Sequence, residues 1–189
     1  MIRANPVLML AAGVILALVP MMGNAQTEEE VYWVKPGDVL DISVWGEPDL
    51  KSSVLVTPDG SFSFPLVGQV NAKQKTVAEL QDTVKQGLAK YLSTPEVNVS
   101  LQQVNGNTIY VIGQVKKPGA FVMTRALDVM QALSMAGGAT PFAALNDILI
   151  LRREANTLVA LPFRYSEVSK GRSLNQNIRL ESGDVVVVP

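Results

Sequence analysis

The sequence contains neither cysteine nor histidine among its 189 residues. Without cysteine there can be no disulfide, no thiolate metal site and no lipid-modified cysteine of the kind that anchors bacterial proteins. Without histidine as well, no Ser-His-Asp or Cys-His nucleophile can be assembled, and zinc loses its preferred nitrogen and sulfur ligands. These absences exclude most common enzyme designs. We therefore predict a protein that is not an enzyme and that binds neither a cofactor nor a metal.

The sequence also lacks an excess of charge of either sign. Charged residues make up 17% of the chain, and the formal net charge is −1. This balance predicts no nucleic-acid partner. No Walker or G-x-G-x-x-G pattern is present, so the usual nucleotide-binding loops are excluded. Six basic residues late in the chain could line a passage for an acidic polymer: Arg152, Arg153, Arg164, Lys170, Arg172 and Arg179. Acidic residues are interspersed among them, which favours the interpretation as solvated surface charge.

The first 25 residues have the pattern of a secretion signal. Arg3 is followed by an apolar run over residues 7–19, and Gly23 and Ala25 supply small residues before a cut at Ala25. A positive start, a short apolar stretch and a small-residue site are typical of a signal peptide, residues 1–25. A permanent membrane anchor is the alternative, but the run is shorter than the roughly 20 residues that span a bilayer.

Strand patterns and one helix follow in the first half. Leu40, Ile42 and Val44 alternate on one face of an extended segment, and residues 53–57 and 61–67 are two further β-like runs. The Pro58-Asp59-Gly60 sequence between those runs predicts a hairpin turn. A capping box at residues 76–79 starts a helix with an apolar stripe through residues 77–91, and residues 97–101 alternate again as a strand.

The second half repeats the mixture of strands and helix. Asn105-Gly106-Asn107 is the best internal boundary, as either a hairpin turn or a hinge between modules. Residues 108–115, 148–151 and 157–161 are β-forming, and residues 185–188 predict a buried strand. A helix is expected over residues 126–136, stopped by the double glycine at 137–138. The fold class is therefore α+β, with two small β-rich modules, each packed with one or two helices.

Residues 35–40 and 181–186 are similar, because in each a Gly-Asp pair leads into an apolar strand. Asp38, Asp59 and Asp184 could supply the two carboxylates of a glycoside hydrolase. Turn chemistry explains them better, since aspartate beside glycine bonds to nearby backbone amides. Tyr32, Trp33 and Trp45 could stack on sugar rings or simply pack in the β-structure. Trp45, beside a Gly-Glu-Pro turn, is the candidate sugar contact.

The ordered motifs resemble the bacterial outer-membrane polysaccharide export family, which includes Wza-like proteins. The first set resembles the polysaccharide export domain, residues 30–104, and the second the SLBB domain, a soluble-ligand-binding β-grasp, residues 107–189. The ending resembles a short branch found beside exosortase systems. The motif residues, expected to serve as structural turns, are Pro36, Gly37, Asp38, Pro58, Asp59, Gly60, Pro65, Gly68, Gly113, Pro118, Gly119, Gly137, Gly138, Gly183 and Asp184.

This resemblance implies a periplasmic, outer-membrane-associated subunit of an exopolysaccharide export channel. It implies a homo-oligomer ring, a polysaccharide chain as cargo and an inner-membrane polysaccharide copolymerase as partner. The sequence departs from long family members in having no cysteine for lipidation, one SLBB-like module and no C-terminal amphipathic helix, so an outer-membrane β-barrel partner is also expected. The alternative is a monomeric periplasmic carbohydrate-binding or sensing module.

Overall fold

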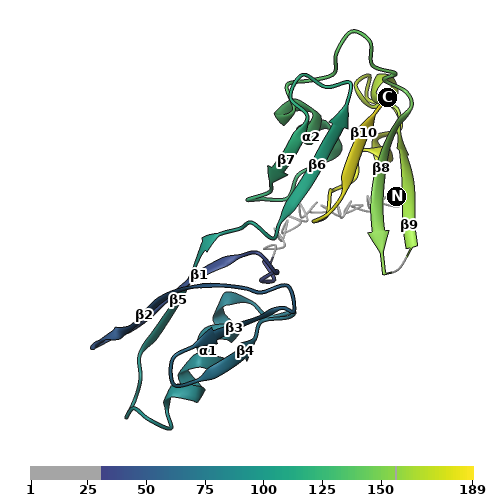
Figure 1. Ribbon diagram of the computed structural model, residues 1–189. Coiled ribbons are helices and arrows are strands. Elements are labelled where there is room, and N and C mark those ends of the chain that lie inside the picture. The colour runs from purple at the N-terminus through teal and green to yellow at the C-terminus, as the bar shows by residue number, and fades with distance from the viewer. Residues whose placement is uncertain (1–30, 156) are drawn as a thin grey trace, which may run out of the picture. The chain divides into compact units, whose positions relative to one another are not determined.

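The computed structural model describes residues 31–155 and 157–189 (Figure 1). The predicted signal peptide and its cut at Ala25 lie outside these residues. The described chain forms three sheets and short helices, with two separate clusters of buried apolar side chains. The first cluster runs from Val34 to Val99 and the second from Ile109 to Val188. The α+β fold class predicted from the sequence is confirmed.

The first cluster is built on a three-stranded antiparallel sheet. Strands β1 (Val39–Val44), β2 (Glu47–Leu55) and β5 (Val97–Gln103) pair in the order β2-β1-β5. Leu40, Ile42 and Val44 are buried, as their alternation predicted. Helix α1 (Val77–Leu88) supplies Leu80 and Val84 to the same cluster, together with Leu88. Burying one face of a sheet against one stripe of a helix is the usual way to close a small α+β core.

Helix α1 begins with the capping box that the sequence predicts. The Thr76 hydroxyl accepts from the Glu79 amide at 3.2 Å, and the Glu79 carboxylate accepts from the Thr76 amide at 2.7 Å. Each side chain satisfies an amide that the first helical turn leaves without a backbone partner. The helix ends at Leu88, three residues before the predicted apolar stripe ends at Tyr91, which is exposed.

The predicted hairpin around Pro58-Asp59-Gly60 is wrong. Strand β3 (Ser61–Phe64) pairs with β4 (Gly68–Asn71) in a separate two-stranded sheet, whereas β2 pairs with β1. The turn itself is tight, since the Gly60 amide donates to the Thr57 carbonyl at 2.8 Å. The two strands nevertheless separate after it because each has a better partner elsewhere. Similarly, β5 and the next strand lie in different sheets, so Asn105-Gly106-Asn107 is not a hairpin turn.

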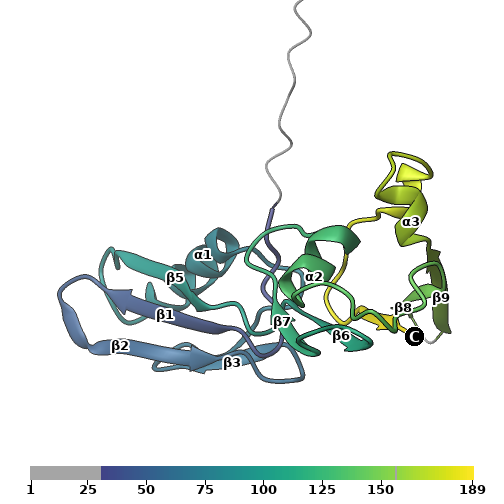
Figure 2. The same cartoon turned by 90° about the horizontal axis from the view of Figure 1, so that it is seen from above.

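The second cluster is built on a five-stranded sheet in the order β7-β6-β10-β8-β9. Its strands are β6 (Thr108–Gly113), β7 (Gly119–Val122), β8 (Ile148–Glu154), β9 (Thr157–Phe163) and β10 (Val185–Val188). Strand β10 runs parallel to β6 and antiparallel to β8. Helices α2 (Val129–Met135) and α3 (Tyr165–Val168) lie on one side of this sheet (Figure 2). A 3₁₀ helix, η1 (Leu174–Gln176), follows them.

Helix α2 is shorter than the predicted span of residues 126–136. It starts after Asp128, whose carboxylate accepts from the Gln131 amide at 2.8 Å, while the Gln131 side chain accepts from the Asp128 amide at 3.0 Å. This is a second capping box, which fixes the first helical residue at Val129. Val129, Ala132 and Leu133 are buried against the sheet. The helix ends before Gly137, as the double glycine predicted.

Candidate functional site

The tip of the β1–β2 hairpin carries the most exposed tryptophan of the described chain. Trp45 and Gly46 form the turn, and Gly46 has a positive φ of 81°. The Trp45 amide donates to the Glu96 carbonyl at 2.8 Å, so the backbone of the tip is fixed to the segment that leads into β5. The side chain itself is 88% exposed, although tryptophan is a large apolar residue that normally packs.

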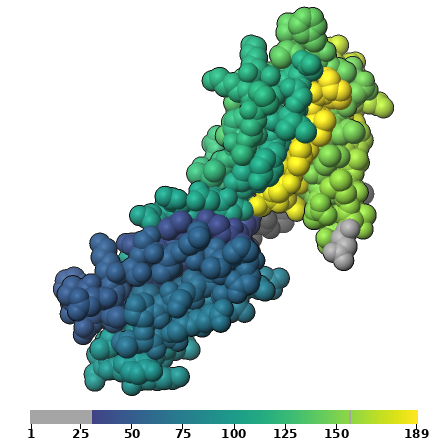
Figure 3. Space-filling view, in the orientation of Figure 1, coloured from purple at the N-terminus to yellow at the C-terminus, as the bar shows by residue number. Residues whose placement is uncertain are grey.

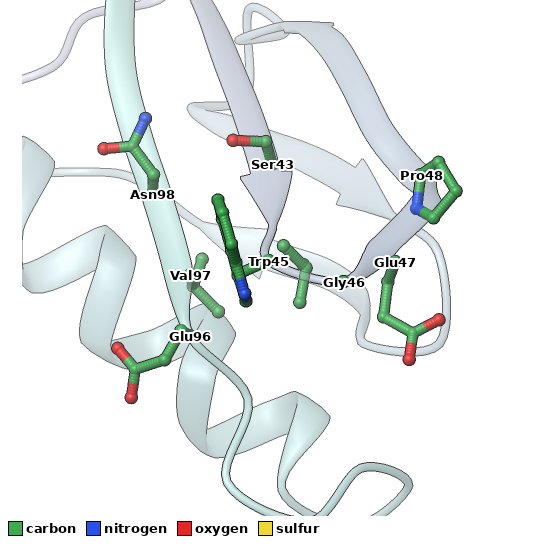
Figure 4. Close-up of a pocket in the computed structure, with 9 residues that line it drawn as sticks. Ser43, Trp45, Gly46, Glu47, Pro48, Glu96, Val97 and Asn98 are labelled. Carbon is green, nitrogen blue, oxygen red and sulfur yellow. The ribbon is translucent and has the colours of Figure 1, made fainter.

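A pocket of about 660 Å³ lies beside this tip (Figure 4). The Trp45 side chain lies next to Val97, with Glu47 and Glu96 on opposite sides of it. The lining of the pocket comes from the end of β1, the turn, the start of β2 and the start of β5: Ser43, Val44, Trp45, Gly46, Glu47, Pro48, Glu96, Val97 and Asn98. The pocket therefore combines a flat aromatic surface with hydroxyl, amide and carboxylate groups.

This combination suits a sugar ring better than an apolar ligand. The indole offers an apolar surface to the C–H face of the ring, and Ser43, Asn98 and the two glutamates can exchange hydrogen bonds with its hydroxyls. Glu96 is also paired with Lys85 at 3.0 Å, with 71% of its side chain exposed. An exposed pair of this kind is weak and leaves the carboxylate accessible.

The side chains of the other two aromatic candidates are less exposed than that of Trp45. Trp33 is 48% exposed. The Tyr32 hydroxyl donates to the Asp38 carboxylate at 2.8 Å, and burial, followed by that hydrogen bond and charge, raises the pKa of Tyr32 far above its usual value. Trp45 is thus the most exposed of the three and the only one of them that lines the pocket.

Asp38 and Asp184 are buried in equivalent turns. Asp38 accepts from the Lys35 amide and Asp184 from the Glu181 amide, each three residues earlier, at 2.9 and 2.8 Å. The similarity between residues 35–40 and 181–186 therefore corresponds to one repeated local structure. The Gly106 amide also donates to Asp38 at 2.8 Å.

Asp184 is neutralised by Arg152. The Arg152 guanidinium donates to both carboxylate oxygens, at 3.1 Å from Nε and 2.7 Å from Nη2. The same hydrogen bonds raise the pKa of Arg152 further above its usual value, although its partial burial opposes them. A buried carboxylate held in this way by a guanidinium and a backbone amide is already fully engaged and is not available to a substrate.

Asp59 is exposed, but its carboxylate is already engaged in hydrogen bonds. Its carboxylate accepts hydrogen bonds from the hydroxyls of Thr57 and Ser61, the second at 2.7 Å. These bonds favour the charged form and lower the pKa of Asp59 below its usual value. A general acid needs the opposite shift. The three aspartates lie in three different turns, and each accepts hydrogen bonds from residues of its own turn.

The remaining motif residues lie in turns, in loops or at strand ends. Positive φ values occur at Gly37, Gly60, Gly68, Gly113, Gly137, Gly138 and Gly183. Gly113 has the tightest surroundings, since a Cβ there would lie 2.0 Å from the Val188 carbonyl oxygen. Gly119 differs from this set: it begins β7 without a positive φ, and a Cβ would meet nothing within 4 Å.

Within residues 31–155 and 157–189, no group of three or more acidic side chains is arranged to hold a metal ion. The same residues contain no helix with the length and apolar character needed to cross a membrane. Two residues of the basic scatter are engaged in ion pairs, Arg152 with Asp184 and Arg172 with Glu167. Sequence reasoning missed the pocket itself because its lining comes from segments about fifty residues apart.

Comparison with known proteins gives two family matches. Residues 26–102 match the family described as polysaccharide biosynthesis/export protein, and residues 107–188 match the SLBB domain. The capsule polysaccharide export outer membrane protein CtrA of Neisseria meningitidis serogroup A is 32% identical over 174 residues, which is 80% of this chain and 43% of that protein.

Two further relatives have similar coverage. The EPS I polysaccharide export outer membrane protein EpsA of Ralstonia nicotianae is 26% identical over 183 residues, 83% of this chain and 47% of that protein. The capsule polysaccharide export protein BexD of Haemophilus influenzae is 26% identical over 175 residues, 81% of this chain and 42% of that protein. The chain thus spans less than half the length of these relatives. They are transport proteins and not enzymes, in agreement with the prediction from the missing histidine and cysteine.

Proposed function

Because the chain belongs to the polysaccharide export protein family, we propose that it is a periplasmic, outer-membrane-associated subunit of an exopolysaccharide export channel. The observation that carries the proposal is the order of the two matched regions along one chain, the export region first and the SLBB domain second. The relatives that this chain matches are named as exporters of capsule or exopolysaccharide. The cargo proposed here is an exopolysaccharide chain, and the protein guides it without cutting it.

The proposed mechanism is architectural. Identical subunits repeated around an axis form a ring whose inner wall presents the same surfaces to the passing chain. An inner-membrane polysaccharide copolymerase delivers the polymer to this ring. The wall must bind sugar weakly, because tight binding would stop the chain from sliding.

Trp45 is the proposed contact with the polymer. The pocket beside it is open, and its side chain is 88% exposed, so a sugar can stack and leave again. Trp45→Ala removes the stacking surface and is expected to reduce the amount of exported polysaccharide. Tyr91→Ala is the matched control, since Tyr91 is an exposed aromatic residue that does not line the pocket.

A gene deletion tests the export role directly. The deletion strain should lose surface and secreted polysaccharide while it continues to make the lipid-linked precursor. Normal polysaccharide export in that strain would refute the proposal. If export persists with Trp45→Ala but is lost in the deletion strain, the export role stands and the assignment of Trp45 does not.

A monomeric carbohydrate-binding or sensing module is the second candidate, which the Trp45 pocket favours. Sedimentation of the purified protein separates the two functions. A monomer at every concentration, with measurable affinity for oligosaccharides cut from the strain's own exopolysaccharide, would support sensing instead of export.

A further inference from the structure

The five-stranded sheet has one face that none of the helices in the described part of the chain covers. Helices α2 and α3 lie on its other side (Figure 2), and the atoms of β6, β10 and β8 lie at the surface as adjacent teal, yellow and green bands in Figure 3. Sheets that face water on one side normally carry polar residues there. Many of the side chains that the strands place on this face are apolar instead, and we call it the open face. It includes Tyr110, Ile112, Val122, Leu149, Leu158 and Val187.

The register places these side chains together. Tyr110 and Ile112 on β6 lie opposite Val185 and Val187 on β10, and Val187 in turn lies opposite Leu149 on β8. Tyr110 and Ile112 are both 45% exposed, and Leu158 on the outermost strand is 56% exposed. The apolar residues therefore continue from β6 through β10 to β8 and are not scattered singly, whereas Leu158 lies opposite the charged Arg153.

The three-stranded sheet in the same chain provides the comparison. Its outward positions are mostly polar: Asp41 lies opposite Ser53 on one side and Ser100 on the other, and Ser43 lies opposite Asn98, with Val39 and Leu55 as one apolar pair. The Ser53 hydroxyl donates to Gln102 across this face at 2.8 Å. This is the composition expected of a sheet surface that water covers. The open face carries more apolar side chains than this one, which is the composition of a sheet surface that other protein atoms cover.

The size of the open face indicates a protein partner. Five strands about 4.8 Å apart, with about 3.3 Å per residue along them, give roughly 400 Å² of flat surface. The largest apolar patch on a typical monomer is about 300–600 Å² and is often functional. A sugar chain does not fit, because its hydroxyls would lose water and find few partners among valine, leucine and isoleucine. A stable pairwise interface buries about 800 Å² on each partner, so further contacts must add to the face.

The same chain presents a second exposed apolar group that can supply them. Phe142 is 85% exposed on the loop between α2 and β8. The loop is anchored on both sides of it, because the Thr140 amide donates to the Gln114 carbonyl at 2.9 Å and the Ala144 amide to the Pro189 carbonyl at 2.7 Å. An aromatic residue on an anchored loop loses little entropy on binding and is typical of interface anchors.

We propose that the open face binds the Phe142 loop of a second copy of this chain. Because the two surfaces differ, the contact is head-to-tail and repeats from copy to copy, which closes into a ring where the rotation allows it. This inference rests on the proposed function, in which several copies of the chain assemble. It identifies the two surfaces that join one copy to the next.

Charge on the open face tests the contact first. Ile112→Glu places a carboxylate among apolar residues of the interface, and its exposed position lets the monomer fold. The expected result is self-association at least tenfold weaker in sedimentation of the purified protein, with an unchanged melting temperature at concentrations where both proteins are monomeric. Gln102→Glu is the matched control, because it adds the same charge to the polar face of the other sheet and keeps the acceptor for Ser53.

Cross-linking then tests the pairing. The chain has no cysteine, so introduced thiols are the only ones present. Chains with Ile112→Cys and chains with Phe142→Cys, carrying tags of different size, are mixed and treated with a short thiol cross-linker. A mixed product is expected from this pair, and little or none when Gln102→Cys replaces Ile112→Cys.

Three results would overturn the inference: a monomer at all concentrations, equal cross-linking with Gln102→Cys, or Ile112→Cys chains that link only to each other. The last would mean a face-to-face dimer. These outcomes are separate from the export assay. If the deletion strain loses export while Ile112→Glu still assembles, only the interface is wrong. If Ile112→Glu prevents assembly and export continues, the ring mechanism is wrong and the interface stands.

Discussion

The Arg152–Asp184 pair should be the most sensitive polar contact of the second cluster. Asp184 is 1% exposed and the Arg152 side chain 14% exposed. Replacing Arg152 with Met keeps the volume of the side chain but leaves a buried carboxylate whose remaining partner, among residues 31–155 and 157–189, is the Glu181 amide. Removing one member of a buried ion pair costs about 3–5 kcal/mol. That is a large part of the about 5–15 kcal/mol that stabilises a typical domain.

Urea unfolding at neutral pH measures this loss. Both clusters contain strands and a helix, so far-ultraviolet circular dichroism follows the unfolding of both. With a slope of about 1 kcal/mol per molar urea, the circular dichroism midpoint should fall by roughly 3 M or more in Arg152→Met. The double variant with Asp184→Asn should recover much of the loss, because no buried charge is left unpaired.

The matched control is Arg172→Met. Arg172 pairs with Glu167 at 2.8 Å, but its side chain is 59% exposed. An exposed pair contributes at most about 1 kcal/mol. If Arg152→Met destabilises the protein no more than Arg172→Met does, then burial of the Asp184 carboxylate has no energetic consequence, and the reasoning is refuted.

Two further predictions concern the backbone and the pH dependence of stability. Gly113→Ala should lower the free energy of unfolding by about 2–5 kcal/mol, because the φ of 93° at Gly113 and its close approach to Val188 both exclude a Cβ. As the control, Gly119→Ala should change the free energy of unfolding by less than about 0.5 kcal/mol in the same urea assay. The raised pKa of Tyr32 means that its contribution to stability is complete below about pH 10, its ordinary range, and is lost as the pH rises towards its folded pKa. Tyr32→Phe should therefore lose less stability between pH 8 and pH 11 than the unchanged protein; equal losses would show that the Tyr32–Asp38 hydrogen bond does not carry this dependence.

Local signals in the sequence predicted local structure well. The capping box at Thr76 and Glu79 identified the start of α1, and alternation identified β1 and β5. The capping box at Asp128 and Gln131 has the same spacing, and applying the rule there would have corrected the start of α2. Helix α3 and strand β4, four residues each, are too short to give a period of their own.

Pairing between distant segments could not be predicted. The Pro58–Gly60 turn is a real turn, but which strands pair depends on residues far away, and β2 finds β1 while β3 finds β4. Residues 185–188 were expected to be buried because a continuous apolar run usually has both faces covered. The structure buries Val186 and Val188 and leaves Val185 and Val187 half-buried on the open face.

The place of β10 in its sheet has a consequence for how the second cluster folds. Strands β6 and β7 form one antiparallel pair from neighbouring segments, as do β8 and β9, and β10 joins the two pairs. Each pair can form as soon as its own residues are available, but the sheet is continuous only after residues 185–188 enter between them. Since contacts between distant segments form slowly, insertion of this strand should be the late step of folding. Until then, both pairs expose edges that can bind another chain.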